Sequence, residues 1–257
     1  MSFITRLRSD STEPPHSDPA TVERIWGERI TGLKGGYTVA YNVERRVDER
    51  LLVRALSFRK SRGLALDVGS FYPETPKRLA GMGWSVVRID LSEEVCRRVR
   101  QVSTEERLAL RAVRCDAAML PFRAGAFDLV TDFVTSVVTP DAASLVSEEV
   151  RVLKPDALYV LVSNNRWTRS GRYHLRQQKR AGNRHPRWGY FSPLSPYDLW
   201  SLTWKCDLRL ISIDSEGHSL RVVGLWLSVV SRVCPFLKRV VGWRLGAAYT
   251  AQAREGP

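Results

Sequence analysis

Short apolar runs alternate with helical patterns along the middle of the chain. Each run is bounded by a glycine or by polar residues, and in the segments between them apolar positions recur every three or four residues. This alternation is typical of βαβ units, in which helices cover a parallel sheet. The predicted strands are residues 64–69, 84–90, 111–116, 127–133, 158–163, 208–214 and 243–252.

The segments between these strands predict helices with recognisable ends. Ser92 precedes two glutamates, which is the pattern of an N-cap followed by acids in the first turn. Pro155 ends another helix, in a turn where Asp156 tolerates a left-handed conformation. Pro196 suits the first turn of a later helix. The predicted helices are residues 20–60, 75–82, a segment that opens at 91–94, 141–153, 195–204 and 225–241.

Together these elements predict a doubly wound α/β fold with a seven-stranded sheet. Residues 1–19 are polar and contain prolines, so we expect no fixed structure there. Residues 20–60 are expected to form a helical cap, and residues 61–257 the α/β domain. Within that domain, residues 164–190 are rich in arginine and weakly apolar, which predicts an insertion.

Composition and spacing exclude several classes of protein. No internal repeat is visible, which argues against a solenoid or propeller. The N-terminus lacks the apolar core of a secretory signal, and the longest apolar stretch, 222–230, is about half of a membrane span. We therefore expect a cytoplasmic protein with free thiols and no metal site, because the cysteines lack metal-ligand spacing. The cysteines are Cys96, Cys115, Cys206 and Cys234.

The net charge of +13 and the isoelectric point near 10.1 have two explanations. They favour an acidic partner, such as nucleic acid or an anionic membrane surface. However, seven lysines and 33 arginines make up the 40 basic residues, a bias that a GC-rich genome also produces. The charge by itself leaves both explanations open.

Acidic residues follow three consecutive predicted strands. Asp67 ends the first strand together with Gly69, Asp90 ends the second, and Asp116 ends the third. In an open α/β sheet, ligands bind beyond the carboxyl ends of the strands. Asp90 follows Gly69 by 21 residues, close to the spacing of roughly 20 at which a carboxylate reaches the ribose of a nucleoside.

The segments that carry these acids resemble, in order, the motifs of the class I S-adenosylmethionine-dependent methyltransferases. The resemblance is continuous over about 100 residues and is most similar to small-molecule enzymes of the ubiquinone and menaquinone C-methyltransferase type. It implies the Rossmann-like fold of that family and S-adenosylmethionine as cofactor. The motifs are LALDVGS, VVRIDLS, RCDAAMLPF, AGAFDLVTDFV and EEVRVLKPDALYVLVS.

The resemblance also implies the cofactor site and shows one departure from the family. In the first loop, Phe71 stands where the family usually has a second glycine, and Pro73 follows it. A nicotinamide-binding domain is disfavoured, because it needs the sequence G-x-G-x-x-G here and Gly69 is alone. The implied cofactor-binding residues are Asp67, Gly69, Ser70, Phe71, Asp90, Leu91, Asp116, Ala117, Asp132 and Phe133.

The catalytic residues are not evident from the sequence. Methyl transfer from a sulfonium is an in-line displacement that positioning accelerates, and a base is needed only if the acceptor loses a proton. The stretch after the fourth strand lacks the N-P-P-Y tetrad of amino-group methylation, and no cysteine is placed for covalent catalysis. Candidates near the acceptor are Tyr37, Tyr41, Asn164, Asn165, His174, His185 and His218.

Two features bear on the acceptor. Residues 164–190 contain eight cations, no acid and interleaved aromatic residues, a pattern that suits single-stranded nucleic acid, an anionic small molecule, phospholipid headgroups or simply a solvated insertion. Residues 222–243 suit either a core helix or a helix at a membrane interface. Three hypotheses follow: a methyltransferase for a small, lipophilic or anionic molecule, an RNA methyltransferase, and a methyltransferase fold that only binds.

Overall fold

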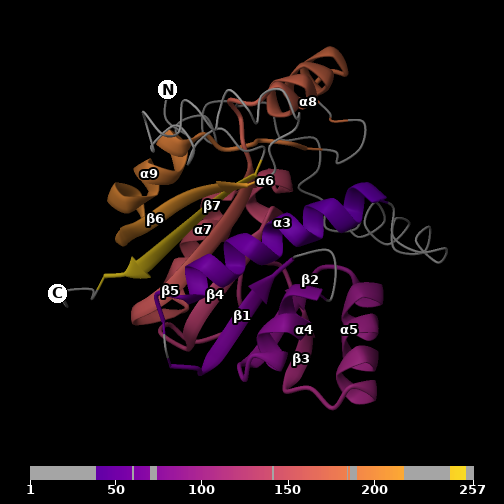
Figure 1. The fold of residues 1–257 in the computed structure, drawn as a ribbon, viewed down its shortest axis with the longest axis vertical. Coiled ribbons are helices and arrows are strands. Elements are labelled where there is room, and N and C mark those ends of the chain that lie inside the picture. The colour runs from indigo at the N-terminus through magenta and orange to yellow at the C-terminus, as the bar shows by residue number, and fades with distance from the viewer. Residues whose placement is uncertain are drawn as a thin grey trace.

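The fold is a seven-stranded, mostly parallel sheet with helices on both faces (Figure 1). The computed structural model describes residues 39–59, 61–69, 74–140, 142–183, 185, 190–216 and 244–252. The strand order is β3-β2-β1-β4-β5-β7-β6, and β7 runs antiparallel to both of its neighbours. The strands are β1 Leu64–Val68, β2 Ser85–Asp90, β3 Leu110–Arg114, β4 Phe127–Phe133, β5 Leu153–Asn164, β6 Leu208–Glu216 and β7 Arg244–Ala251.

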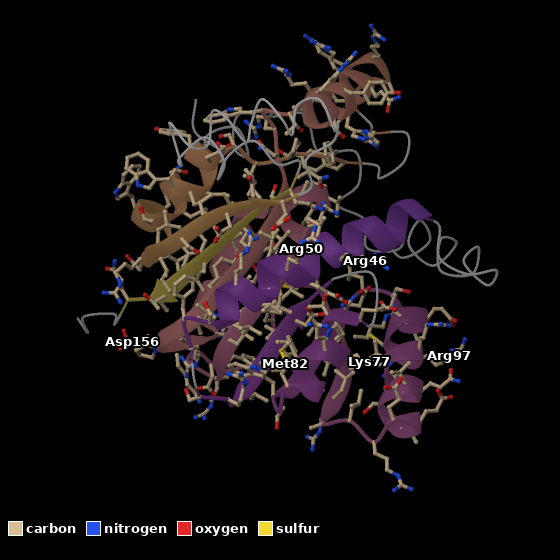
Figure 2. The ribbon with its side chains drawn as sticks, in the orientation of Figure 1. Arg46, Arg50, Lys77, Met82, Arg97 and Asp156 are labelled. Carbon is tan, nitrogen blue, oxygen red and sulfur yellow. The ribbon has the colours of Figure 1, made fainter. Side chains whose placement is uncertain are left out.

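All seven predicted strands are therefore confirmed. The largest difference concerns β5, which begins at Leu153 and takes in the predicted Lys-Pro-Asp-Ala turn as an irregularity in its pairing with β4. Asp156 has a φ of 56°, so the predicted left-handed position is present inside the strand. The carboxyl ends of β1 to β5 lie at the other end of the sheet from Asp156 (Figure 2).

The described helices include two that the sequence did not predict, α6 and α8. Helix α6 has a single turn, and α8 lies inside the segment predicted as an insertion. The predicted tail at 1–19 and the predicted helix at 225–241 lie outside the described residues. The helices are α3 Val39–Leu56, α4 Glu74–Gly81, α5 Glu93–Glu105, α6 Thr135–Val138, α7 Ala142–Arg151, α8 Arg169–Arg180 and α9 Pro196–Lys205. None of the described helices is long and apolar enough to cross a membrane.

Two apolar clusters fill the two sides of the sheet. One joins α7 and α9 to the strands, and the other joins α3, α4 and α5 to them. Helix α3 crosses one face of the sheet and packs so closely that a methyl group at Gly246 would lie 3.1 Å from Leu51 (Figure 1). Arg50 of the same helix pairs with Glu216 at 3.2 Å. The described part of the predicted cap thus packs against the sheet itself.

The order of the strands reverses beside β1. From β1 the chain passes first to β2 and β3, and then returns to β4 on the other side. Open α/β sheets bind ligands beyond the carboxyl ends of the strands at such a reversal, here those of β1 and β4. The sheet therefore places the candidate site at this edge.

Two of the fully buried acids, Asp132 and Glu149, have raised pKa values. Asp132 of β4 accepts hydrogen bonds from the amides of Thr135 and Ser136, which fixes the start of α6. Burial raises the pKa of Asp132 to about 6, although these hydrogen bonds lower it. Glu149 of α7 accepts a hydrogen bond of 2.6 Å from the Tyr159 hydroxyl. Burial, together with the charge of Asp132, raises the pKa of Glu149 well above its ordinary value.

We predict that Asp132 makes the protein less stable as the pH rises from 4 to 6. Unfolded Asp132 loses its proton near pH 4, whereas the folded residue holds it until about pH 6, so the folded state binds more protons in this window. Asp132→Asn keeps the acceptor oxygen for α6 and removes the titration. Denaturant unfolding at pH 4.0 and 6.5 should show the wild type losing roughly 1–3 kcal/mol more stability than the variant.

The variant should still lose some stability over this range, because Glu149 also has a raised pKa. Glu105→Gln, which changes an exposed acid at the end of α5, should keep the wild-type pH dependence. Equal pH dependence of Asp132→Asn and the wild type would show that the Asp132 carboxyl is not a source of this instability.

Candidate cofactor and acceptor site

The three acids predicted from the sequence lie on three adjacent strands. Asp67 precedes the last residue of β1, Asp90 is the last residue of β2, and Asp116 follows the end of β3 by two residues. Because β1, β2 and β3 are parallel neighbours, these residues succeed one another along one edge of the sheet. The edge is the one at which the strand order reverses, so the predicted grouping is present.

Gly69 makes the turn that leaves β1. Its φ is 54°, and its amide donates to the Ile89 carbonyl of β2 at 3.0 Å. A methyl group at this position would lie 2.6 Å from the Thr135 side chain, so the turn requires glycine for both backbone and space. The Thr135 hydroxyl in turn donates to the Val68 carbonyl at 2.7 Å. Ser70, Phe71 and Pro73, which complete the predicted loop, lie outside the described residues.

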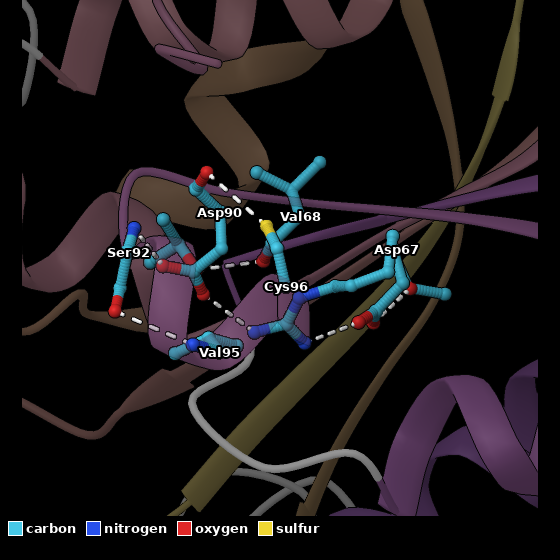
Figure 3. Close-up of polar contacts among 9 residues, drawn as sticks. Asp67, Val68, Asp90, Ser92, Val95 and Cys96 are labelled. Carbon is cyan, nitrogen blue, oxygen red and sulfur yellow. Dashed lines mark hydrogen bonds and ion pairs between the residues drawn. The ribbon is translucent and has the colours of Figure 1, made fainter. Parts of the chain in front are cut away.

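Asp90 is held from two sides. One carboxylate oxygen accepts the Ser92 amide at 3.0 Å, and the other accepts the Arg88 guanidinium at 2.8 Å (Figure 3). Ser92 accepts from the Val95 amide, which confirms it as the N-cap of α5. The Asp90 side chain remains 13% exposed. A carboxylate has about four acceptor positions, so Asp90 retains capacity for hydroxyl donors from a ligand.

Asp116 and its neighbour line the next part of the edge. One carboxylate oxygen of Asp116 accepts the Ala118 amide at 2.9 Å, and the residue is partly exposed. Ala117 is also partly exposed and packs against the apolar cluster below it. Leu91 is likewise partly exposed, and its carbonyl accepts from Arg114 at 3.0 Å. These residues are positioned to contact a ligand that also reaches Asp90.

Three of the residues predicted to bind the cofactor are buried, namely Asp67, Asp132 and Phe133. Asp67 is fully buried and accepts from Thr131 at 2.9 Å and from Arg88 at 2.6 Å. Asp132 is also fully buried and caps α6, while Phe133 is 6% exposed and belongs to the core. Their part in binding the cofactor remains a prediction, and their visible role is to build the floor of the site.

Val134, which the sequence did not single out, follows β4 in a strained conformation. Its φ is 72°, although a β-branched side chain strongly disfavours the left-handed region. The amide of Val134 donates to the Val162 carbonyl of β5 at 2.9 Å, and α6 starts at the next residue. No local sequence signal marks this position, because a valine after a buried strand predicts only more strand. The strain lies where the fold places its ligand site.

The residues present fit a nucleoside bearing a sulfonium group. Asp90 and Asp116 offer carboxylate acceptors, and a nucleoside offers ribose hydroxyl and adenine amino donors. The cofactor carries a positive charge at sulfur, and this edge of the sheet is rich in carboxylates. The described residues contain no cluster of histidine, cysteine and acidic side chains that would hold a metal ion.

The candidates for the acceptor side are only partly brought together. The Nδ1 atom of His174 lies 3.2 Å from the Nε2 atom of the buried His185, and both rings pack against Phe191. Asn164 ends β5 and accepts from Arg244 at 2.8 Å, and Asn165 is buried. Tyr37, the side chain of Tyr41, and His218 lie outside the described residues.

Comparison with known proteins agrees with this geometry. The family model described as "Methyltransferase domain" matches residues 66–161, which extend from β1 into β5. Nocamycin O-methyltransferase from Saccharothrix syringae is 32% identical over 127 residues, which are 49% of this chain and 43% of that protein. The chain thus matches less than half the length of this curated relative.

Solved structures show the same fold at low identity. An S-adenosylmethionine-dependent methyltransferase from Methanosarcina mazei superposes with a TM-score of 0.58 and 17% identity, covering 79% of this chain and 98% of the other. The [4+2]-cyclase SpnF superposes with a TM-score of 0.59 and 14% identity, covering 79% of this chain and 80% of the other.

The matched segment, the acids at the ends of three parallel strands and the shared architecture agree with one another. Residues 66–161 match the methyltransferase-domain family, and the chain has the fold of class I S-adenosylmethionine-dependent methyltransferases.

Proposed function

We propose that the protein transfers the methyl group of S-adenosylmethionine to a small molecule. The observation that carries this proposal is the pair of partly exposed carboxylates, Asp90 and Asp116, on neighbouring strand ends at the reversal of strand order. Asp90 would accept hydrogen bonds from the ribose hydroxyls and Asp116 from the adenine amino group. The fit of these donors and acceptors supports a nucleoside cofactor.

The cofactor, when bound, supplies an electrophilic methyl group on a positively charged sulfur. The protein then has to hold the acceptor in line with that methyl group, and such positioning is worth up to several orders of magnitude in rate. Asp67, Thr131 and Thr135 make the floor beneath the site rigid, because their side chains bond to neighbouring strands and loops. A rigid floor favours one orientation of the nucleoside.

An oxygen acceptor is favoured over the carbon acceptor of the quinone-type enzymes. The support is the relative from Saccharothrix syringae, whose name specifies an O-methyltransferase. A hydroxyl acceptor loses a proton during the reaction, so a base assists the step. The His174–His185 pair is the proposed base, because the unperturbed pKa of histidine lies near neutral pH and the second ring is within hydrogen-bond distance of the first.

A second candidate function is methylation of RNA, which the structure of α8 favours. At about 100° per residue, its five cations fall within an arc of about 100°, and all are exposed. Gly171, on the opposite face, is buried so closely against Asn165 that a methyl group would lie 2.3 Å from its carbonyl oxygen. The cationic face is made by Arg169, Arg172, Arg176, Lys179 and Arg180.

We predict that Asp90→Ala weakens the binding of S-adenosylmethionine and S-adenosylhomocysteine at least tenfold, or by about 1.4 kcal/mol. The expected cause is the loss of the carboxylate that accepts from the ribose. Isothermal titration calorimetry on the purified protein measures the effect. Glu105→Ala is the matched control, because it removes one exposed acid from the far end of α5. If the folded wild type binds neither ligand, the result would favour the hypothesis of a methyltransferase fold that binds another molecule without catalysis.

We predict that the methylated product is small. In an extract supplied with radiolabelled S-adenosylmethionine, the label should appear in molecules that pass a 3 kDa filter and should resist ribonuclease. An Arg172→Gln/Arg176→Gln/Lys179→Gln variant should retain this activity, since these side chains are exposed on α8. Ribonuclease-sensitive label that falls in the triple variant, with a steep dependence on salt, would instead establish the RNA function.

A further inference from the structure

The interior of the sheet contains a buried chain of charges between β1 and β2. Arg88 of β2 is 0% exposed and lies opposite Asp67 in the parallel register. Its guanidinium donates to Asp67 at 2.6 Å and to Asp90 at 2.8 Å (Figure 3). Asp67 is itself tied to Thr131 of β4 at 2.9 Å. One continuous set of hydrogen bonds therefore extends from β4, through β1, to the end of β2.

Stability alone does not account for this arrangement. Removing a guanidinium and two carboxylates from water is costly, and apolar side chains of similar volume usually fill such a space at lower cost. Burial lowers the pKa of Arg88, but the two carboxylates raise it by more than burial lowers it. The guanidinium therefore stays charged. The cluster holds two carboxylates and one guanidinium, and its outermost member, Asp90, is the one that reaches the surface.

The geometry fixes Asp90 in one orientation. Arg88 holds one of its oxygens and the Ser92 amide holds the other, so rotation of the carboxylate breaks both bonds. Arg88 is anchored in turn by Asp67, in the centre of the sheet. We propose that Arg88 is a positioning residue, which orients the Asp90 carboxylate toward the ribose hydroxyls of the bound nucleoside.

This inference rests on the proposed nucleoside site, and its test uses ligand affinity. S-adenosylhomocysteine is compared with its 2′-deoxy and 3′-deoxy forms by calorimetry, so that the ratio of dissociation constants measures recognition of the ribose hydroxyls. Arg88→Met alone would leave two carboxylates without their shared partner and would be at risk of unfolding. The comparison is therefore made in an Asp67→Asn background, in which the introduced amide is neutral and Asp90 is the remaining acid of the cluster.

In the Asp67→Asn background, adding Arg88→Met should reduce the discrimination between S-adenosylhomocysteine and its deoxy forms at least fivefold. Circular dichroism and thermal melting confirm that both proteins are folded. In an Asp67→Asn/Asp90→Ala background, the same Arg88→Met change should leave the discrimination unaltered, because Arg88 then has no ribose-binding carboxylate to orient. A residue that only supported the fold would weaken all ligands equally in both backgrounds.

Unchanged discrimination on adding Arg88→Met to folded Asp67→Asn protein would overturn the inference while leaving the proposed function intact. Wild-type protein that binds S-adenosylhomocysteine and its deoxy forms equally would also overturn it, since Asp90 would then not recognise the ribose. Wild-type protein that binds none of these ligands would overturn the proposed function, and this inference with it.

Discussion

The structure depends on a group of paired charges inside its sheet. Asp67, Arg88 and Asp90 lie between two central parallel strands, where water is absent from at least the first two side chains. Removing one partner from a buried ion pair typically costs about 3–5 kcal/mol, because the charge left behind has no compensation. The strands that carry these residues cannot slip by one position, since the guanidinium would then move to the opposite face of the sheet. The ion pairs thus fix the register that places the acids at the edge.

From this register follows the shape of the carboxyl edge. The turn at Gly69 closes over β2 through its bond to Ile89, and it leaves no room for a side chain beside Thr135. On the other side of the reversal, Asp132 starts α6 while Val134 holds a left-handed conformation. Strain of this kind costs on the order of 1–3 kcal/mol and persists only where the surroundings impose it. Buried acids and strained backbone therefore concentrate at the edge where open α/β sheets bind ligands.

The sequence predicted the strands well, because each is a short apolar run bounded by polar or flexible residues. It also located Asp90 and Asp116, since acids at strand ends stand out against those runs. It did not reveal Arg88, because an arginine within VVRID resembles a position facing solvent. The missing information was the register of β1 against β2, which pairs Arg88 with Asp67. Pairing across a sheet is a tertiary property, so local pattern cannot supply it.

Helix α8 was missed for a different reason. Its sequence has almost no apolar residues, so the usual periodicity of a helix is absent, although Thr168 forms an N-cap by accepting from the Gly171 amide at 3.1 Å. The periodicity is instead one of charge, with the cations on one face and the buried glycine on the other. The spacing of the cations is visible in the sequence. Finding it would have required testing the charged residues for a period of 3.6 residues.

The positive charges of α8 and the acids of the proposed cofactor site lie on different elements of the fold. The cations of α8 are exposed to solvent, whereas the carboxylates that suit a nucleoside lie at the edge of the sheet. A small acceptor seated at that edge, as proposed above, would meet its carboxylates. Under the proposed function, the exposed cations would act on a polyanion at the surface, and the carboxylates on the bound nucleoside. Charge on the surface and specificity in the site are consequently two independent properties of this fold.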